Sequence, residues 1–454
     1  MQAFIIVDLG FGDAGKGILT DFLVRKFNAG VVVRYNGGAQ AGHNVISPDG
    51  RHHTFSQFGS GSFVPGVKTI LSRDVIVHPT ALLVEGDFLR EKGVQDAFSR
   101  IKISDQALII TPYHQAANHL RELIRGDERH GSCGVGVGET VEDALINPQD
   151  CIRAGDLYAP AVLRRKLKTI REFKRHQLTG VLNSHKADGD FVRQWEIFEN
   201  EDVIDNWLSA VARVAQYGLV VPDSKLREGM QRSETVIFEG AQGVLLDADA
   251  GFHPYTTWSN CTGENALELV AEMLPGFSPV QIGVLRSYAV RHGPGPLPTE
   301  SEVLTSVISE HNRVNQWQGR VRYGWFDALL TRYALNTAGK MDGLFVTHLD
   351  VLSHLKTWHY CNGYEGQPCF DKPYIHTKTK DDVLVNFSLP RSLALEQREQ
   401  FTQALSEVVP ILGTCEPDET QVIEKIEFLL DQSVDMISRG PGAGDVEIIN
   451  AYPH

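Results

Sequence analysis

A short run of apolar residues near the start of the chain, from Phe4 to Leu9, is typical of a buried strand in a parallel sheet. Residues 10–17 follow with the sequence GFGDAGKG, and the apolar spacing over residues 18–23 predicts a helix. Such a strand, glycine turn and helix direct several backbone N–H groups at one point, which suits a phosphate group. The pattern alone leaves open a tight structural turn with an exposed lysine.

The residues inside this turn differ from a standard P-loop, in which four residues separate the first glycine from a Gly-Lys-Ser/Thr ending. Lys16 adds a mobile positive charge, but Gly17 follows it, so no hydroxyl is present there for magnesium. Gly12 and Gly15 leave room for close approach of the backbone. Asp13 lies beside the expected phosphates, and it would repel them unless it holds a metal ion or takes part in the chemistry.

Further apolar runs extend this pattern along the chain. They predict strands at residues 31–35, 75–77, 108–110, 344–346 and 434–437. Residues 159–232 are charged and helical in rhythm, with Trp195 and Trp207 as the expected packing anchors. Because strands alternate with helices, we expect a mostly parallel sheet.

Composition narrows the class of protein. The chain has 454 residues, 42% hydrophobic and 22% charged, which is ordinary for a globular protein with a large core. The formal net charge of −14 argues against a nucleic-acid or membrane partner, so an anionic substrate would need locally placed arginines. No apolar run approaches the ~20 residues of a membrane-spanning helix. The six cysteines lack short paired spacings, which predicts reduced thiols and a cytoplasmic location.

A second glycine-rich loop follows the second predicted strand. Residues 36–44 read NGGAQAGHN, so that the loop ends in His43. A lone histidine is more often structural than catalytic. Its place on a glycine loop at a strand end, next to an expected phosphate loop, favours a functional role.

The two loops together resemble the N-terminal signature of adenylosuccinate synthetases, the family that joins IMP and aspartate with hydrolysis of GTP. Further similar blocks follow in the family's order, at residues 238–243 (FEGAQG), 254–257 (PYTT), 293–300 (GPGPLPTE), 319–322 (GRVR), 324–327 (GWFD), 347–350 (THLD) and 438–441 (SRGP). The resemblance implies one large α/β domain over residues 1–454. It also implies a mostly parallel central sheet flanked by helices, with a helical elaboration at about residues 159–232.

The resemblance also implies catalytic roles. Asp13 would take the N1 proton of the purine and bind Mg²⁺, with the Gly42 carbonyl as a second metal ligand. His43 would support phosphoryl transfer to the 6-oxygen, Lys16 would neutralise the γ-phosphoryl group, and Gln242 would hydrogen-bond the reacting edge of the base. This chemistry is consistent, because a 6-oxo group leaves poorly until it is phosphorylated, after which an amine can displace phosphate.

The remaining matches imply substrate contacts. Arg320 and Arg322 would hold the amino-acid co-substrate, since guanidinium groups suit carboxylates. Asp350 would pair with guanine N1–H and the 2-amino group, which favours GTP over ATP. The GTP site would comprise Gly12, Gly15, Lys16, Gly17, Gly42, His43, Asp350, Ser438 and Gly440, and the acceptor site Asp13, Gln40, Ser132, Cys133, Gln242 and Thr257.

For several of these residues the sequence leaves a structural role open. Gln242 fits a buried amide paired with backbone, Asp350 a helix cap, and the stretch around Arg320 a solvated basic segment. A zinc site is a further alternative for His348, His354, His359, Cys361, Cys369 and His376. The tight paired spacings typical of structural zinc are absent there.

The departures from the family pattern lie at substrate positions. In the nucleotide-phosphate loop at residues 131–138 (GSCGVGVG), Cys133 and Val135 replace threonine and arginine. Residues 147–150 replace an arginine that, in the homodimers of the family, reaches the neighbouring subunit's phosphate site. The loss of two cationic contacts should weaken monophosphate binding, since each charge-assisted hydrogen bond is worth about 1.5–3 kcal/mol. Arg153 and Arg291 are the candidates to replace these contacts.

Other departures also affect recognition. They are Ala14 for glutamate, Gln40 for asparagine, Asn44 for threonine, residues 315–318 (NQWQ) for threonines, and His348 for the lysine that would stack over guanine. We therefore expect a GTP- and Mg²⁺-dependent carbon–nitrogen ligase that prefers an acceptor or amino acid other than IMP and aspartate. The alternative is a phosphotransferase or NTPase of the same fold that joins no amine. The complete catalytic set argues against a silent binding protein.

Overall fold

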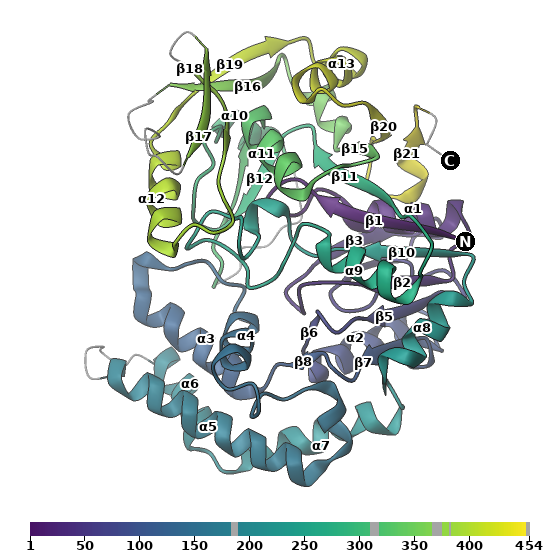
Figure 1. The fold of residues 1–454 in the computed structure, drawn as a ribbon, viewed down its shortest axis with the longest axis vertical. Helices are drawn as coiled ribbons and strands as arrows, with labels where there is room; N and C mark the ends of the chain where they lie inside the picture. Colours follow the sequence, from purple (N-terminus) through teal and green to yellow (C-terminus); the bar gives the residue numbers. More distant parts are fainter. Residues whose placement is uncertain (183–188, 309–316, 366–374, 381–382, 451–454) are drawn as a thin grey trace.

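The computed structural model describes residues 1–182, 189–308, 317–365, 375–380 and 383–450. Its largest element is a ten-stranded sheet with the order β21-β20-β15-β11-β1-β10-β2-β5-β7-β9 (Figure 1). Neighbouring strands are parallel, except that β21 is antiparallel to β20. This confirms the expected α/β fold. The strands are β1 (Gln2–Asp8), β2 (Val31–Arg34), β5 (Lys68–Leu71), β7 (Ile101–Ser104), β9 (Val220–Val221), β10 (Thr235–Glu239), β11 (Val280–Arg286), β15 (Gly343–Thr347), β20 (Val434–Ser438) and β21 (Val446–Ile448).

Helices cover both faces of this sheet. Ile5 and Val7 of β1 belong to a core that includes residues of α9 and α11, whereas Phe4 and Ile6 pack in a separate core with α1. The central strand is therefore buried on both sides, as its continuous apolar run predicts. The helices are α1 (Lys16–Lys26), α2 (Pro79–Glu91), α3 (Pro112–Arg125), α4 (Val137–Ile146), α5 (Pro160–Leu182), α6 (Gly189–Glu199), α7 (Asp202–Gln216), α8 (Asp223–Gln231), α9 (Glu264–Met273), α10 (Glu302–Val307), α11 (Ala328–Ala338), α12 (Leu395–Ser406) and α13 (Glu419–Leu430).

Smaller sheets surround the central one. The runs at 31–35, 344–346 and 434–437 form β2, β15 and β20 of the large sheet, as expected. The runs at 75–77 and 108–110 instead form a separate pair, while β5 and β7 take places in the large sheet. The strands outside the large sheet are β6 (Ile76–Val77) with β8 (Leu108–Ile109), β3 (His43–Ile46) with β4 (His52–Phe55), β12 (Ala289–His292) with β13 (Val321–Gly324), and a group of β14 (Phe326–Asp327), β16 (Trp358–Glu365), β17 (His376–Lys380), β18 (Val383–Ser388) and β19 (Val409–Cys415).

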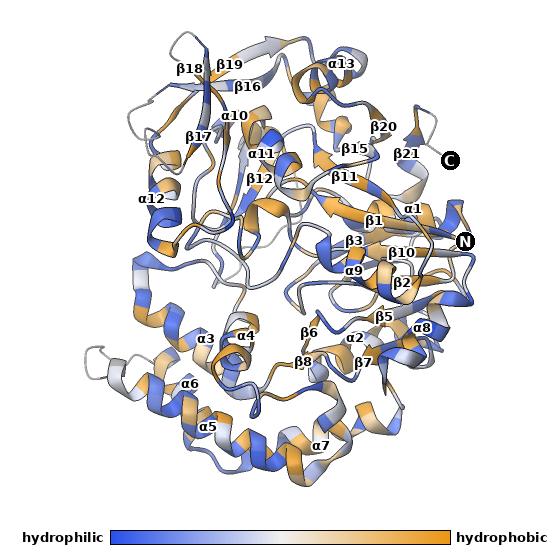
Figure 2. Cartoon of the chain, in the orientation of Figure 1, coloured by the Kyte–Doolittle hydropathy of each residue, from blue (hydrophilic) through white to orange (hydrophobic). Residues whose placement is uncertain are grey.

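The segment at 159–232 forms α5 to α8, and its short strand β9 extends the edge of the large sheet. Trp207 is 6% exposed, and Trp195 packs partly buried against the same core. Figure 1 shows α5 to α7, with α3 and α4, at the opposite end of the molecule from β16 to β19. Apolar and polar residues alternate along α5 and α7 in Figure 2, as in amphipathic helices with one buried face. None of the described helices has both the length and the apolar character needed to cross a membrane.

Candidate active site

The loops that follow β1, β2 and β10 meet at one edge of the sheet. A Cβ placed on Gly17 would lie 3.0 Å from the Cβ of His43, and one placed on Gly12 would lie 3.7 Å from the Cα of Gln242. These strands are neighbours and run parallel, so their carboxyl ends present their loops on the same side. The structure thus brings together segments that lie more than 200 residues apart in the sequence.

The first glycine loop is organised by the last residue of β1, Asp8. Its carboxylate accepts hydrogen bonds from the backbone N–H groups of Gly10 (2.9 Å) and Ala14 (3.0 Å), and it pairs with Lys16 Nζ at 2.6 Å. Lys16 is only 3% exposed. Lys16 was expected to be a mobile cation, but it is buried and held against the loop by Asp8. The sequence pattern placed Asp8 inside a strand.

Asp13 is held in an unusual conformation by two residues that the sequence analysis missed. Its φ is +56°, a left-handed conformation that is uncommon outside glycine. Its Oδ2 lies 2.6 Å from His292 Nε2, and its backbone carbonyl accepts a hydrogen bond from Arg286 Nε at 2.6 Å. Burial raises the pKa of Asp13, but the hydrogen bond and charge of His292, with Arg286 and Lys16, hold that pKa well below its ordinary value. The carboxylate is therefore ionised.

His43 is coupled to a buried carboxylate. Its Nδ1 lies 2.6 Å from Oε1 of Glu239, whose Oε2 accepts the N–H of Ser60 at 3.0 Å. Burial lowers the pKa of His43 more strongly than Glu239 raises it, while the pKa of Glu239 falls to about 2 despite its burial. The ring is thus neutral, with Nδ1–H donating to the carboxylate and Nε2 as an acceptor. An arriving phosphoryl anion would raise the pKa of the ring and favour a proton on Nε2.

Two glutamines present unsatisfied oxygens near this centre. The buried Oε1 atoms of Gln242 and Gln40 have no hydrogen-bond partner among the described residues. A Cβ on Gly37 would lie 2.9 Å from Oε1 of Gln242, and one on Gly38 would lie 2.9 Å from Oε1 of Gln40. Leaving such a buried acceptor unpaired costs about 1–3 kcal/mol, which a ligand donor would offset. The structural alternative for Gln242 was an amide paired with the backbone, but its Oε1 has no such partner among the described residues.

Comparison with known proteins matches this arrangement to one family. The family model described as adenylosuccinate synthetase matches residues 5–446. The chain belongs to the adenylosuccinate synthetase family. It is therefore a GTP-dependent ligase that forms carbon–nitrogen bonds.

Relatives and solved structures agree with this assignment. The adenylosuccinate synthetase of Rhodococcus jostii is 36% identical over 375 residues, which cover 80% of this chain and 81% of the relative. That of Mycobacterium leprae is 35% identical over 377 residues, with the same coverage of 80% and 81%. The fully ligated enzyme of Plasmodium falciparum shares the fold, with a TM-score of 0.74 and 20% identity over 99% of this chain and 100% of that one. Succinoaminodeoxyadenylate synthetase of cyanophage S-2L, bound to dGMP and dATP, gives a TM-score of 0.59 at 15% identity, over 99% and 96%.

The two arginines matched to the family's amino-acid loop differ in environment. Arg322 donates to the carbonyls of Gly293 (3.0 Å) and Gly295 (2.7 Å) and pairs with Glu300 at 2.8 Å. Arg320 is 72% exposed and lies 3.3 Å from the same Glu300 carboxylate. Two guanidiniums that share one carboxylate show that the pair can converge on such a group. A solvated basic segment describes Arg320 but not Arg322.

The arginines considered as replacements for the missing phosphate contacts have other partners. Arg291 is 1% exposed, and its guanidinium donates to the carbonyls of Pro294, Pro296 and Tyr255. Burial, followed by the charge of Arg322, lowers its pKa to about 9. Arg153 donates to a backbone carbonyl at 2.6 Å. Arg291 therefore holds the 294–296 loop in place and is not available to a phosphate.

The segment matched to guanine recognition lies where β15 and β20 end. Asp350 is an exposed residue of a 3-10 helix (Leu349–His354) whose N-cap is His348, so Asp350 is not the cap. Burial, followed by the charge of Arg286, lowers the pKa of His348 well below its usual value, so its ring is neutral. Ser438 Oγ donates to the Gly440 carbonyl at 2.8 Å. A neutral His348 cannot supply the cation that the family's lysine would place over guanine.

The other residues predicted for the acceptor and metal sites differ in their surroundings. Ser132 accepts a hydrogen bond from Asn118 at 2.8 Å, and the N–H of Thr257 donates to a backbone carbonyl at 2.8 Å. Burial and the nearby charge of Asp13 raise the pKa of the Cys133 thiol to about 11, so it is neutral. Gly42 is exposed directly before His43.

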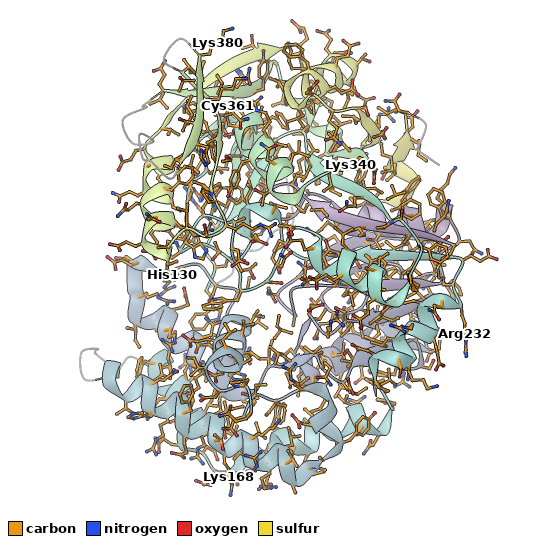
Figure 3. The ribbon with its side chains drawn as sticks, in the orientation of Figure 1. His130, Lys168, Arg232, Lys340, Cys361 and Lys380 are labelled. Atoms are coloured by element: carbon orange, nitrogen blue, oxygen red, sulfur yellow. The ribbon has the colours of Figure 1, made fainter. Side chains whose placement is uncertain are left out.

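The described part of the chain holds no group of three or more His, Cys, Asp or Glu side chains that could bind a metal ion. In the segment considered for zinc, His359 packs against Trp325, and the Cys361 thiol donates to the Gly363 carbonyl at 3.2 Å. Figure 3 labels Cys361 at the end of the molecule that carries β16 to β19. Cys369 and residues 315 and 316 lie outside the described residues.

Proposed function

We propose that this enzyme uses GTP and Mg²⁺ to phosphorylate the 6-oxo group of a purine-like acceptor, and that an amino acid then displaces the phosphate. We further propose that its preferred acceptor, amino acid or both differ from IMP and aspartate. The observation that carries the proposal is the convergence of Asp13, His43 and Gln242 from three separate strand ends. Three groups meet there: an ionised aspartate, an imidazole hydrogen-bonded to a carboxylate, and an unpaired amide oxygen. Together they can bind the N1–H and 6-oxo edge of a purine and move a proton there.

Each residue has a defined task in this reaction. Asp13 is an ionised carboxylate and accepts the N1 proton as the γ-phosphoryl group moves to O6. Nε2 of His43 lies on the ring edge away from Glu239, and once the phosphoryl anion has favoured a proton there it donates a hydrogen bond to a phosphoryl oxygen. The unpaired Oε1 of Gln242 accepts a hydrogen bond from the purine-like substrate. The amine then attacks C6, phosphate leaves with the former 6-oxygen, and the amine loses its proton.

The donors at this centre fit magnesium. Mg²⁺ prefers oxygen ligands, and an ionised Asp13 with the backbone carbonyl of Gly42 supplies them. His292 engages Oδ2 of Asp13, and the same carboxylate would hold the ion. When bound, the ion neutralises charge on the transferring phosphoryl group.

Recognition of the other two substrates follows from the arginine and aspartate positions. Arg320 and Arg322 hold a carboxylate of the amino acid in the place that Glu300 now occupies. Asp350 selects guanine, with Ser438 and Gly440 beside it. We also propose that the whole chain works as one domain, as a homodimer, and in the cytoplasm.

The test is phosphate release from GTP with Mg²⁺ across a panel of 6-oxopurine acceptors and amino acids. Release that needs both an acceptor and an amino acid, with the joined product seen by mass spectrometry, supports the proposal. Phosphate release independent of any amino acid would instead favour the phosphotransferase or NTPase. Efficient adenylosuccinate formation, with kcat/KM above ~10⁴ M⁻¹s⁻¹, would contradict the altered specificity.

A further inference from the structure

The loop at residues 131–138, which we call the acceptor loop, already uses backbone groups that a phosphate would need. The N–H of Gly136 donates to Asn118 Oδ1 at 3.1 Å, and the N–H of Gly131 donates to Glu122 Oε2 at 3.3 Å. The Glu122 side chain is fully buried. This carboxylate occupies the N–H of Gly131, which could otherwise donate to a phosphate.

An indole ring covers the middle of the acceptor loop. Trp317 stacks on His119 with ring centroids 4.1 Å apart and an interplanar angle of 6°. His119 Nε2 lies 2.7 Å from the carbonyl oxygen of Gly134, and a Cβ added to Gly134 would lie 2.6 Å from Cδ1 of Trp317. The glycine is required because the indole lies directly against the backbone.

A second indole lies at the C-terminal end of the same loop. A Cβ added to Gly138 would lie 2.8 Å from Cδ1 of Trp258, which is 47% exposed. Between the two indoles, Val135 packs against the buried apolar cluster of Ile76, Ile110 and Val137. The acceptor loop is therefore bordered by two aromatic rings, and its Val135 lies in an apolar contact.

Three cations beneath the loop pair with carboxylates. Arg121 pairs with Glu139 at 2.7 Å, and Lys174 pairs with Glu139 at 2.6 Å. Arg125 pairs with Glu122 at 2.7 Å. Glu139 lies in the first turn of α4, where its charge already meets the positive end of the helix dipole. His130, labelled in Figure 3 near the end of α3, adds no charge, since burial lowers its pKa to about 4.

We propose that the acceptor is an uncharged purine nucleoside or base, and that the acceptor loop binds its distal part by aromatic and aliphatic contact rather than by holding a 5′-phosphate. The acceptor loop offers apolar surface beside paired charges, whereas a 5′-phosphate is held best by cations that are not already paired with a carboxylate. This inference rests on the proposed function, because it concerns the acceptor of that same reaction.

The experiment compares matched acceptors on the intact enzyme. Inosine and IMP are titrated separately into the protein with a non-hydrolysable GTP analogue and Mg²⁺, and both are assayed for GTP-dependent joining to the amino acid found in the panel. We expect inosine to bind at least tenfold more tightly than IMP and to give the higher kcat/KM. Equal affinity, or a preference for IMP, overturns the inference. Ligation of IMP alone would overturn it while leaving the ligase intact, whereas phosphate release from GTP without joining of any acceptor in the panel would overturn both proposals.

A charge variant provides a second readout. Val135→Arg places a cation on the acceptor loop and should shift the inosine-to-IMP ratio toward IMP by at least tenfold. Leu145→Arg is the matched control, because Leu145 is a 71% exposed residue of α4 outside the loop and receives the same charge. A control that shifts the ratio as much as Val135→Arg contradicts a local effect. Inosine preference of the wild-type protein decides the question if Val135→Arg does not fold.

Discussion

Two glycine-rich turns of this enzyme, residues 10–17 and the acceptor loop at residues 131–138, share one backbone plan yet carry opposite chemistry. Both place a left-handed glycine directly before a helix, at Gly15 before α1 and at Gly136 before α4. In the first turn the charges of Asp13 and Lys16 lie at the loop itself, and Lys16 pairs with Asp8. In the second turn Glu139 lies on the helix and its cations are paired. Under the proposed function, a backbone arranged like that of a phosphate-binding loop does not by itself make a phosphate site, because side-chain charge also decides what the N–H groups bind.

The largest effect should come from the first turn and the neighbouring loop at residues 36–44. Asp13→Asn and His43→Asn should each lower kcat by at least ~10²-fold, as is usual when an acid–base group is removed. The measurement is steady-state turnover at saturating substrates, with circular dichroism to confirm folding. Near wild-type turnover in either variant would show that the substituted residue is not needed for catalysis. The proposed difference in chemistry between the two turns would then be wrong.

A smaller effect should come from the partner of Asp13. His292→Val removes the 2.6 Å contact to Oδ2 and should lower kcat about tenfold with little change in KM, since a hydrogen bond to a charged group is worth about 1.5–3 kcal/mol. His292→Gln keeps an amide donor and should restore part of the rate. If the Val and Gln variants are equally slow, the histidine does not act by orienting the carboxylate.

Base selection should change by several-fold. Asp350→Asn loses an acceptor for the guanine N1–H and should reduce kcat/KM for GTP while leaving that for ATP unchanged. The measurement is kcat/KM for GTP and for ATP on the same protein preparation, so that each nucleotide serves as the control for the other. An equal loss with both nucleotides would show that Asp350 does not distinguish the bases.

The smallest effect concerns stability at acidic pH. The pKa of Glu239 is about 2 in the folded protein against an ordinary 4.5, so the unfolded chain binds more protons between these values. Its stabilising contribution is therefore complete above about pH 5 and is lost as the pH falls toward 2. Urea unfolding between pH 3 and pH 6 should show a weaker pH dependence for Glu239→Gln than for wild type. If the free energy of unfolding depends on pH identically in Glu239→Gln and wild type, then groups other than Glu239 cause the acid sensitivity.

Local patterns predicted much of the fold. The apolar run of β1 and the glycines after it identified the first strand, turn and helix. Burial of a strand and reversal of the chain both depend on residues that are adjacent in the sequence. The runs at 75–77 and 108–110 also form strands, but which sheet they join depends on packing partners far along the chain.

The contacts of the candidate site were less predictable. The Asp8–Lys16 pair lies within one loop, yet the aspartate belonged to a strand pattern. The His292–Asp13 contact joins residues 279 positions apart, so no local signal indicates it. The orphaned oxygen of Gln242 appears only after folding.

The central claim is that the 6-oxygen of the acceptor leaves as phosphate. The direct measurement uses a 6-oxopurine acceptor labelled with ¹⁸O at the 6-position, incubated with the enzyme, GTP, Mg²⁺ and the amino acid, followed by mass spectrometry of the released phosphate. The account predicts one ¹⁸O atom in the phosphate for each joined product. Unlabelled phosphate, with the label still on the purine or lost to water, would contradict it.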